Sequence, residues 1–83
     1  MMTLEEAAKE MMNAVRVVGC IYRYVDGFEL ELQKNSHELF LRIKGKEALD
    51  YPTVRMIAEK FFSPAKVIGS YTSGRYAVVM AEV

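Results

Sequence analysis

Hydrophobic residues in the first part of the chain recur every three or four positions, which is the period of an amphipathic helix. Thr3 and Glu6 fit the S/T-x-x-E capping box, in which each side chain pairs with a backbone N–H of the first turn. We therefore predict a helix that begins after Thr3 and ends near Ala14. Its apolar stripe, which we assign to the core, consists of Leu4, Ala7, Ala8, Met11 and Val15.

The pattern then changes to the alternation of a strand, because β-branched and aromatic residues increase between Arg16 and Val25. Asp26-Gly27 follows, and both residues tolerate the positive φ angles of a two-residue type I′ hairpin turn. One face of this hairpin is predicted to be apolar apart from Arg23. The expected cross-strand pairs are Val25 with Phe28, Arg23 with Leu30, Ile21 with Leu32, Tyr24 with Glu29 and Tyr22 with Glu31.

A second hairpin is predicted to turn at Asn35-Ser36 and to continue the same apolar face across a third strand. On the reverse face, this register brings Glu29 beside Arg42 and Glu31 beside Phe40. The expected apolar pairs are Leu32 with Leu39, Leu30 with Leu41 and Phe28 with Ile43.

Gly45 ends the third strand, and the segment "EALDYP" leads into a second helix with Asp50 or Tyr51 at its cap and Pro52 in its first turn. Ser63-Pro64 ends this helix, because the residue before proline avoids helical dihedrals. Its apolar stripe is Val54, Ile57, Ala58, Phe61 and Phe62. A last hairpin is predicted around Thr72-Ser73-Gly74.

Both alternating sets of the last hairpin are apolar, and strands of this kind are usually covered on both faces. One helix on each face of the sheet provides that cover. We therefore predict a single α+β domain over residues 1–83, with the order α-β-β-β-α-β-β, a mostly antiparallel five-stranded sheet and a three-layer α/β/α sandwich. Tyr22, Tyr24 and Phe40 would then lie partly under a helix.

The element order, the hairpins "VDGF" and "KNSH", and the helix "DYPTVRMIAEKFF" resemble a small uncharacterised α+β protein family of methanogenic archaea. Members of that family have α-β(3)-α-β(2) topology in a three-layer fold, and the resemblance spans the whole chain. It implies a cytoplasmic archaeal protein of unknown role, and it raises the expectation of calcium binding.

Composition narrows the classes of function. The 11 basic and 11 acidic residues balance, so no general attraction to nucleic acid or to anionic membranes is expected. No apolar run reaches the length of a bilayer span, and the acidic N-terminus differs from a signal peptide. The single cysteine, Cys20, excludes an internal disulfide and a CxxC site. A cytoplasmic protein is the expectation.

Residues for catalysis are few. The one histidine, His37, falls in a predicted turn and is expected to be exposed, and Cys20 falls inside a predicted strand and is expected to be buried. The segment "GSYTSGRY" lacks the GxxxxGK[ST] phosphate-loop pattern and precedes a strand, whereas phosphate loops open onto a helix. The carboxylates show no acid/base spacing, so we do not expect an enzyme.

Carboxylates in turns give one ligand hypothesis, because Ca²⁺ binds several oxygens that a flexible loop brings together. Surface charge that only aids solubility is the alternative, since Asp50 has a second explanation in capping and Glu29 in pairing with Arg42. The candidate Ca²⁺ ligands are Asp26, Glu29 and Glu31 at the first hairpin, and Glu47 and Asp50 before the second helix.

Two other functions stay open. The C-terminal strand "YAVVMAEV" carries a single charge and, at a sheet edge, would pair with a protein partner or a second copy of the chain. An RNA-binding module is the weaker alternative. The α-β-β-β-α order and the basic residues Arg42, Lys44 and Lys46 favour it, but the second helix starts with acidic residues where RNA-binding domains of this order are basic.

Overall fold

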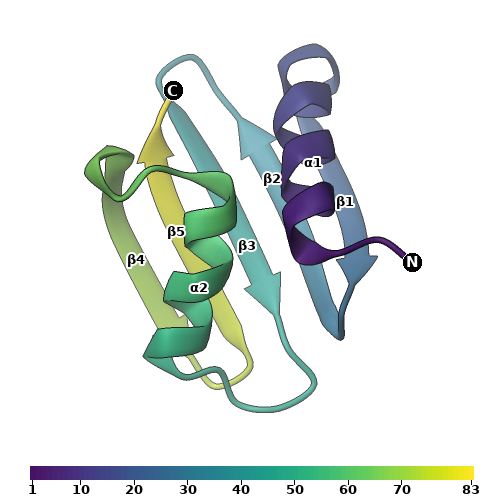
Figure 1. The fold of residues 1–83 in the computed structure, drawn as a ribbon. Helices are drawn as coiled ribbons and strands as arrows, with labels where there is room; N and C mark the ends of the chain where they lie inside the picture. The colour runs from purple at the N-terminus through teal and green to yellow at the C-terminus, as the bar shows by residue number, and fades with distance from the viewer.

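The computed structural model describes all residues from 1 to 83 and confirms an α+β fold with the order α-β-β-β-α-β-β (Figure 1). The five strands form one sheet in the order β1-β2-β3-β5-β4, in which every neighbouring pair is antiparallel. The elements are α1 Leu4–Val18, β1 Cys20–Val25, β2 Phe28–Lys34, β3 Glu38–Lys44, α2 Tyr51–Phe61, the short 3₁₀ helix Pro64–Lys66, β4 Val67–Ser73 and β5 Tyr76–Glu82.

The β1–β2 hairpin has the predicted turn and the predicted register. Asp26 and Gly27 have φ angles of 56° and 85°, which a type I′ turn requires and which few residues other than asparagine, aspartate and glycine adopt. Val25 lies opposite Phe28, and Tyr22 lies opposite Glu31, as expected. The two turn residues therefore determine which side chains of β1 and β2 share a face.

The β2–β3 hairpin differs from the prediction by two positions. Leu32 lies opposite Leu41 rather than Leu39, and Glu31 rather than Glu29 lies opposite Arg42. The cause is Asn35, which pairs with Glu38 and accepts hydrogen bonds from the N–H groups of His37 and Glu38 on its side-chain oxygen. Asn35 thus borders the turn instead of occupying it. Because the shift is two residues, each side chain keeps its predicted face.

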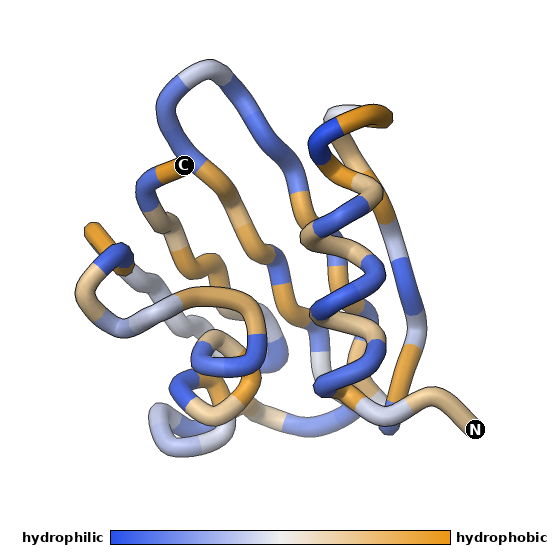
Figure 2. The backbone as a smooth tube through the Cα atoms, turned by 45° about the horizontal axis from the view of Figure 1, so that its top comes forward, coloured by the Kyte–Doolittle hydropathy of each residue, from blue (hydrophilic) through white to orange (hydrophobic).

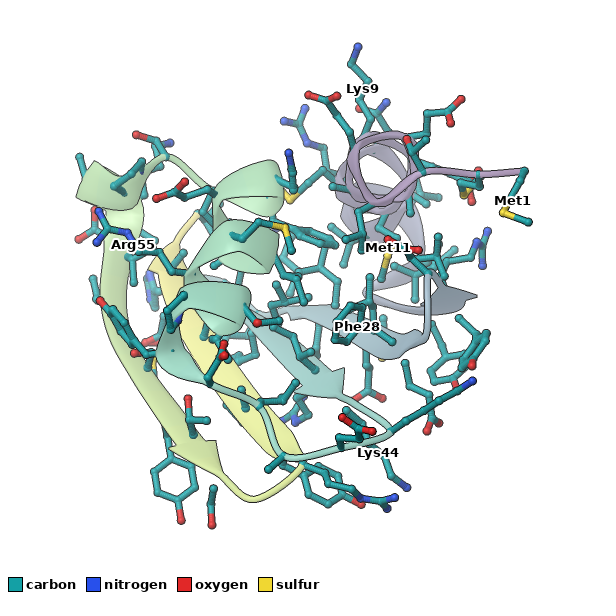
Figure 3. All side chains as sticks on the ribbon, turned by 60° about the horizontal axis from the view of Figure 1, so that its bottom comes forward. Met1, Lys9, Met11, Phe28, Lys44 and Arg55 are labelled. Carbon is teal, nitrogen blue, oxygen red and sulfur yellow. The ribbon has the colours of Figure 1, made fainter.

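Both helices pack on the same face of the sheet, so the three-layer prediction is wrong. Figure 1 shows α1 and α2 side by side in front of the strands, and Figure 3 shows both on one side of the sheet. The Cα extents of 31 × 30 × 17 Å fit one helix layer on one sheet. The other face, where Tyr22 and Tyr24 are 52% and 56% exposed, has no covering layer.

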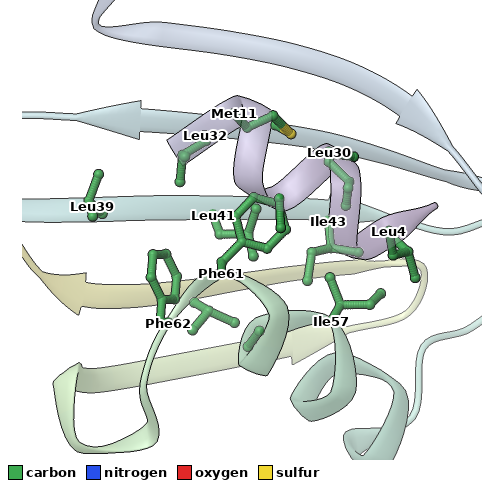
Figure 4. Close-up of a cluster of buried hydrophobic side chains, with 14 of the residues drawn as sticks. Leu4, Met11, Leu30, Leu32, Leu39, Leu41, Ile43, Ile57, Phe61 and Phe62 are labelled. Carbon is green, nitrogen blue, oxygen red and sulfur yellow. The ribbon is translucent and has the colours of Figure 1, made fainter. Parts of the chain in front are cut away.

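A single core explains this arrangement, since both helical stripes and one sheet face contribute to one cluster of 19 buried residues. Figure 4 shows Met11 of α1 toward Leu30 and Leu32 of β2, and Phe61 of α2 toward Leu41 of β3, within this one cluster. Every residue of the two predicted stripes is buried. Helices on opposite faces would divide the same residues between two smaller cores, each with less apolar area removed from water.

The ends of the helices follow local hydrogen-bonding signals. The capping box between Thr3 and Glu6 is present, and the hydrogen bonds from Thr3 lower the pKa of Glu6. Helix α1 continues to Val18 rather than Ala14, because Gly19, with φ 79°, provides the left-handed cap that ends it. Asp50 caps α2 by accepting from Thr53, which lowers the pKa of Asp50.

The last hairpin turns at Gly74-Arg75, which overlaps the predicted turn around Thr72-Ser73-Gly74. Strand β5 lies between β3 and β4, so the C-terminal strand does not have the edge position at which it would pair with another chain. A bulge between Val67 and Gly69 moves Val67 to the helix side, opposite Ala81. The edge strands are β1 and β4.

Candidate functional site

The uncovered face of the sheet is the largest feature that folding leaves unexplained, and we call it the open face. Hydrophobic and hydrophilic residues alternate along the strands in Figure 2, so each strand gives one set of side chains to the core and one to the open face. The open face carries Cys20, Tyr22, Tyr24, Glu29, Glu31, Gln33, Glu38, Phe40, Arg42, Lys44, Tyr71, Tyr76, Val78, Met80 and Glu82.

One part of the open face is apolar. Phe40 lies opposite Met80, and Val78 lies opposite Tyr71, so these side chains are direct cross-strand neighbours on β3, β5 and β4. The rings of Tyr71 and Tyr76 are more than half exposed. We call this group the apolar patch: Phe40, Tyr71, Tyr76, Val78 and Met80. Contiguous exposed apolar side chains with a polar border mark sites of protein association.

The polar border is a band of ion pairs across β2 and β3. Arg42 Nη1 lies 3.4 Å from Glu31 Oε1, and Lys44 Nζ lies 3.9 Å from Glu29 Oε2. The same two cations approach aromatic rings of the apolar patch, at 5.8 Å from the Phe40 centroid and 5.4 Å from the Tyr76 centroid. The charges of this band are thus largely neutralised within the face.

Tyr22 of β1 belongs to the same band of polar contacts. Its hydroxyl donates to Glu29 Oε1 at 2.7 Å, and this hydrogen bond raises the pKa of Tyr22. The ring is thereby held beside β2 with its edge in water. Glu29 consequently contacts both Tyr22 and Lys44.

The two ends of the open face carry different charges. At one end, Glu38 lies directly opposite Glu82, and the pair places two carboxylates side by side. At the other end, Lys44 lies opposite Tyr76, and Arg75 occupies the adjoining β4–β5 turn. Because Lys44 pairs with Glu29, the face has an acidic end and an opposite end whose positive charge comes from Arg75.

The predicted calcium ligands do not form a common site. Glu29 and Glu31 are paired with basic residues, Asp26 occupies the β1–β2 turn, and Asp50 caps α2. Glu47 lies exposed in the loop between β3 and α2. No three histidine, cysteine, aspartate or glutamate side chains come together as a metal ion requires. The three carboxylates at the first hairpin, Asp26, Glu29 and Glu31, therefore do not converge on one point.

The two residues that were considered for catalysis, Cys20 and His37, both lie exposed. Cys20 is exposed at the start of β1, rather than buried as expected, and its thiol donates to Glu31 Oε2 at 3.7 Å. Partial desolvation and the Glu31 carboxylate raise the pKa of Cys20, so the thiolate is scarce at neutral pH. His37 is exposed in the β2–β3 turn, as predicted.

A second feature that the sequence did not indicate is a groove of about 240 Å³ between α2 and β4. Its apolar lining includes Val54, Ala58 and Phe62, and Arg55 and Ser70 stand among its polar residues. The groove exists because α2 leaves the side of β4 that faces the helix layer partly uncovered. We call it the α2–β4 groove.

Neither helix is long and apolar enough to cross a bilayer. The resemblance to a family of methanogenic archaea stays a prediction. Comparison of the chain with protein-family models, curated proteins and solved structures finds no match.

Proposed function

We propose that this protein is an interaction module that self-associates through its open face. The observation that carries this proposal is the apolar patch, which stays in water because both helices cover the opposite side of the sheet. The C-terminal strand, β5, contributes Tyr76, Val78 and Met80 to this interface. These side chains project from the open face, so β5 contributes through its face rather than through a sheet edge. Two sheets packed face to face would give an α/β/β/α dimer.

The size of the face is sufficient for a dimer of moderate affinity. With five strands of up to seven residues, strand spacing of about 4.8 Å and a rise of about 3.4 Å per residue give roughly 24 × 24 Å. Two such faces together cover roughly 1,100 Å², just above the ~1,000 Å² expected of a biological interface. An interface at this small end of the size range is typical of weak association, and we expect a dissociation constant in the micromolar range.

Charge complementarity favours a second copy as the partner. A two-fold axis perpendicular to the strands places the acidic end of one face, with Glu38 and Glu82, over the end of the other face that carries Arg75. The ion pairs between β2 and β3 then lie near the middle of the interface. The apolar patches overlap in the same arrangement.

The open face does not suit the other functions considered. Its carboxylates outnumber its basic side chains, which disfavours RNA. Calcium binding stays a prediction without geometric support, because the candidate ligands are dispersed or already paired. The cytoplasmic location expected from the single cysteine likewise stays a prediction.

Val78→Glu tests the proposal, because it introduces a charge at the centre of the apolar patch. Sedimentation equilibrium over roughly 1–500 μM is expected to show concentration-dependent dimers for the wild type, with dissociation constants in the micromolar range. The variant is expected to stay monomeric over the same range, since removing the new carboxylate from water costs several kcal/mol even with Arg42 opposite it on β3.

Val17→Glu is the matched control, because it makes the same replacement at a residue of α1 that is 87% exposed and distant from the open face. This variant should dimerise like the wild type. A wild-type protein that is monomeric at 500 μM would contradict the proposal, as would equal dimerisation of the Val78→Glu variant.

A further inference from the structure

Strand β4 is an edge strand whose only protection is one bulge near its start. Natural edge strands carry charges or prolines that prevent pairing with other chains, whereas Val67–Ser73 contains neither. Five of its seven residues are exposed, among them Ile68, Ser70 and Thr72. One bulge between Val67 and Gly69 interrupts the strand, and the segment after it is regular.

The regular part of β4 presents free backbone groups to solvent. Ser73 and Tyr76 flank the two-residue loop and form the first hydrogen-bonded pair of the hairpin. In an antiparallel ladder such pairs alternate, so the N–H and C=O groups of Ser70 and Thr72 point away from β5. They are positioned to pair with an added strand.

The α2–β4 groove lies beside these backbone groups on the helix side. Ser70 of β4 belongs to its lining, together with Val67 and with Val79 of β5. Its volume of about 240 Å³ is below the ~300 Å³ of the smallest usual small-molecule sites and suits one or two apolar side chains. An added strand directs alternate side chains to this side of the sheet.

Charges at the two ends of β4 decide what kind of strand fits. Lys66 precedes the strand and Arg75 follows it in the turn, and neither forms an ion pair within the chain. Arg55 and Glu59, which line the groove, form an ion pair with each other. Glu82 and Lys66 both line a separate hollow. A two-fold pairing of β4 with a second β4, centred on Ser70, would bring Lys66 close to Arg75 of the other copy at both ends.

We propose that β4 and the α2–β4 groove bind an extended peptide segment of a partner protein, with apolar residues at its centre and acidic residues at its ends. The peptide adds a strand antiparallel or parallel to β4, and its backbone pairs with Ser70 and Thr72. One central side chain enters the groove. The side-chain carboxylates of the acidic residues at its two ends lie near Lys66 and Arg75. This site lies outside the open face and does not depend on self-association.

The test is a titration of ¹⁵N-labelled protein with the acetylated, amidated peptide Glu-Thr-Val-Ile-Val-Thr-Glu, followed by amide chemical shifts. Saturable shifts are expected at Ser70, Thr72 and Ala58, with a dissociation constant on the order of 10–200 μM. Hydrogen exchange of the Ser70 and Thr72 amides should slow in the complex. The titration is repeated on Val78→Glu, where binding should be unchanged.

Charge reversal provides the specificity control. The peptide with lysine in place of both glutamates should bind roughly tenfold more weakly, since two exposed attractions become repulsions. The double variant Lys66→Glu, Arg75→Glu, whose changes are both at exposed positions, should reverse this preference.

Three results would overturn the proposal: no saturable shift up to millimolar peptide, shifts confined to open-face residues such as Tyr22, or equal affinity for the two peptides. Loss of peptide binding would leave dimerisation through the open face intact. Loss of dimerisation would likewise leave peptide binding intact.

Discussion

Replacement of Val79 by glutamate is expected to prevent folding, whereas the same replacement at the adjacent Val78 should leave the protein folded. Val79 is 1% exposed and lies on the core face of β5, opposite Leu41. A carboxylate buried there without a partner costs several kcal/mol, comparable with the roughly 4–12 kcal/mol expected for a chain of this size. Val78 points to the open face, where water solvates the new charge.

Circular dichroism and urea unfolding at low micromolar concentration measure both outcomes. The two variants have the same composition and differ only in which neighbouring residue of β5 is changed. Strand propensity therefore affects them equally. If both variants fail to fold, both faces of β5 are buried, and the one-sided arrangement of the helices is wrong.

Leu41→Ala is expected to lower the free energy of unfolding by about 3 kcal/mol, within the usual 2–5 kcal/mol for a fully buried leucine. Leu41 is 0% exposed and lies on β3, the middle strand of the sheet. It belongs to the core cluster to which both helices contribute, with Phe61 of α2 beside it in Figure 4, so neighbouring groups cannot easily fill the cavity. The midpoint of urea unfolding should fall while the slope m stays unchanged.

Phe40→Ala is the control for this cavity, because Phe40 precedes Leu41 on the same strand and points to the open face. Although this change removes more atoms, it should cost only about 1 kcal/mol, since the ring is already partly in water. A loss at Phe40 equal to that at Leu41 would contradict the assignment of the two faces.

Local signals in the sequence predicted the elements and, apart from Val67 at the β4 bulge, the faces of the strands correctly. Asp26-Gly27 specified one register because few other residue pairs adopt its backbone angles. Asn35 was ambiguous, since the same side chain can occupy a turn or border it with hydrogen bonds. The resulting shift of two residues changed the ion-pair partners but not the faces.

The layering was not predictable from these patterns. Apolar residues on both faces of β5 indicated cover on both sides, yet Val78 and Met80 stay partly exposed. Helix position depends on which arrangement forms the larger single core, and this is a property of all 19 core residues together. The open face and the α2–β4 groove are consequences of that choice, so no local motif marks them.

The candidate cation ligands show a second property that sequence spacing alone does not predict. Sequence spacing brought Asp26, Glu29 and Glu31 close along the chain, but alternation along β2 and pairing with β3 determine what each one contacts. Glu29 and Glu31 share a face and each meets a basic residue across the strand. Register, rather than the number of carboxylates, therefore decides whether oxygens converge.

The most direct test of the account is the set of side-chain nuclear Overhauser effects in the folded protein. Helices on one face predict contacts between Phe61 of α2 and Met12 or Val15 of α1, which line one shared hollow. They also predict no contact between the rings of Tyr22 or Tyr24 and any residue of either helix. Contacts from these rings to a helix, with none between α1 and α2, would contradict the two-layer fold and remove the open face.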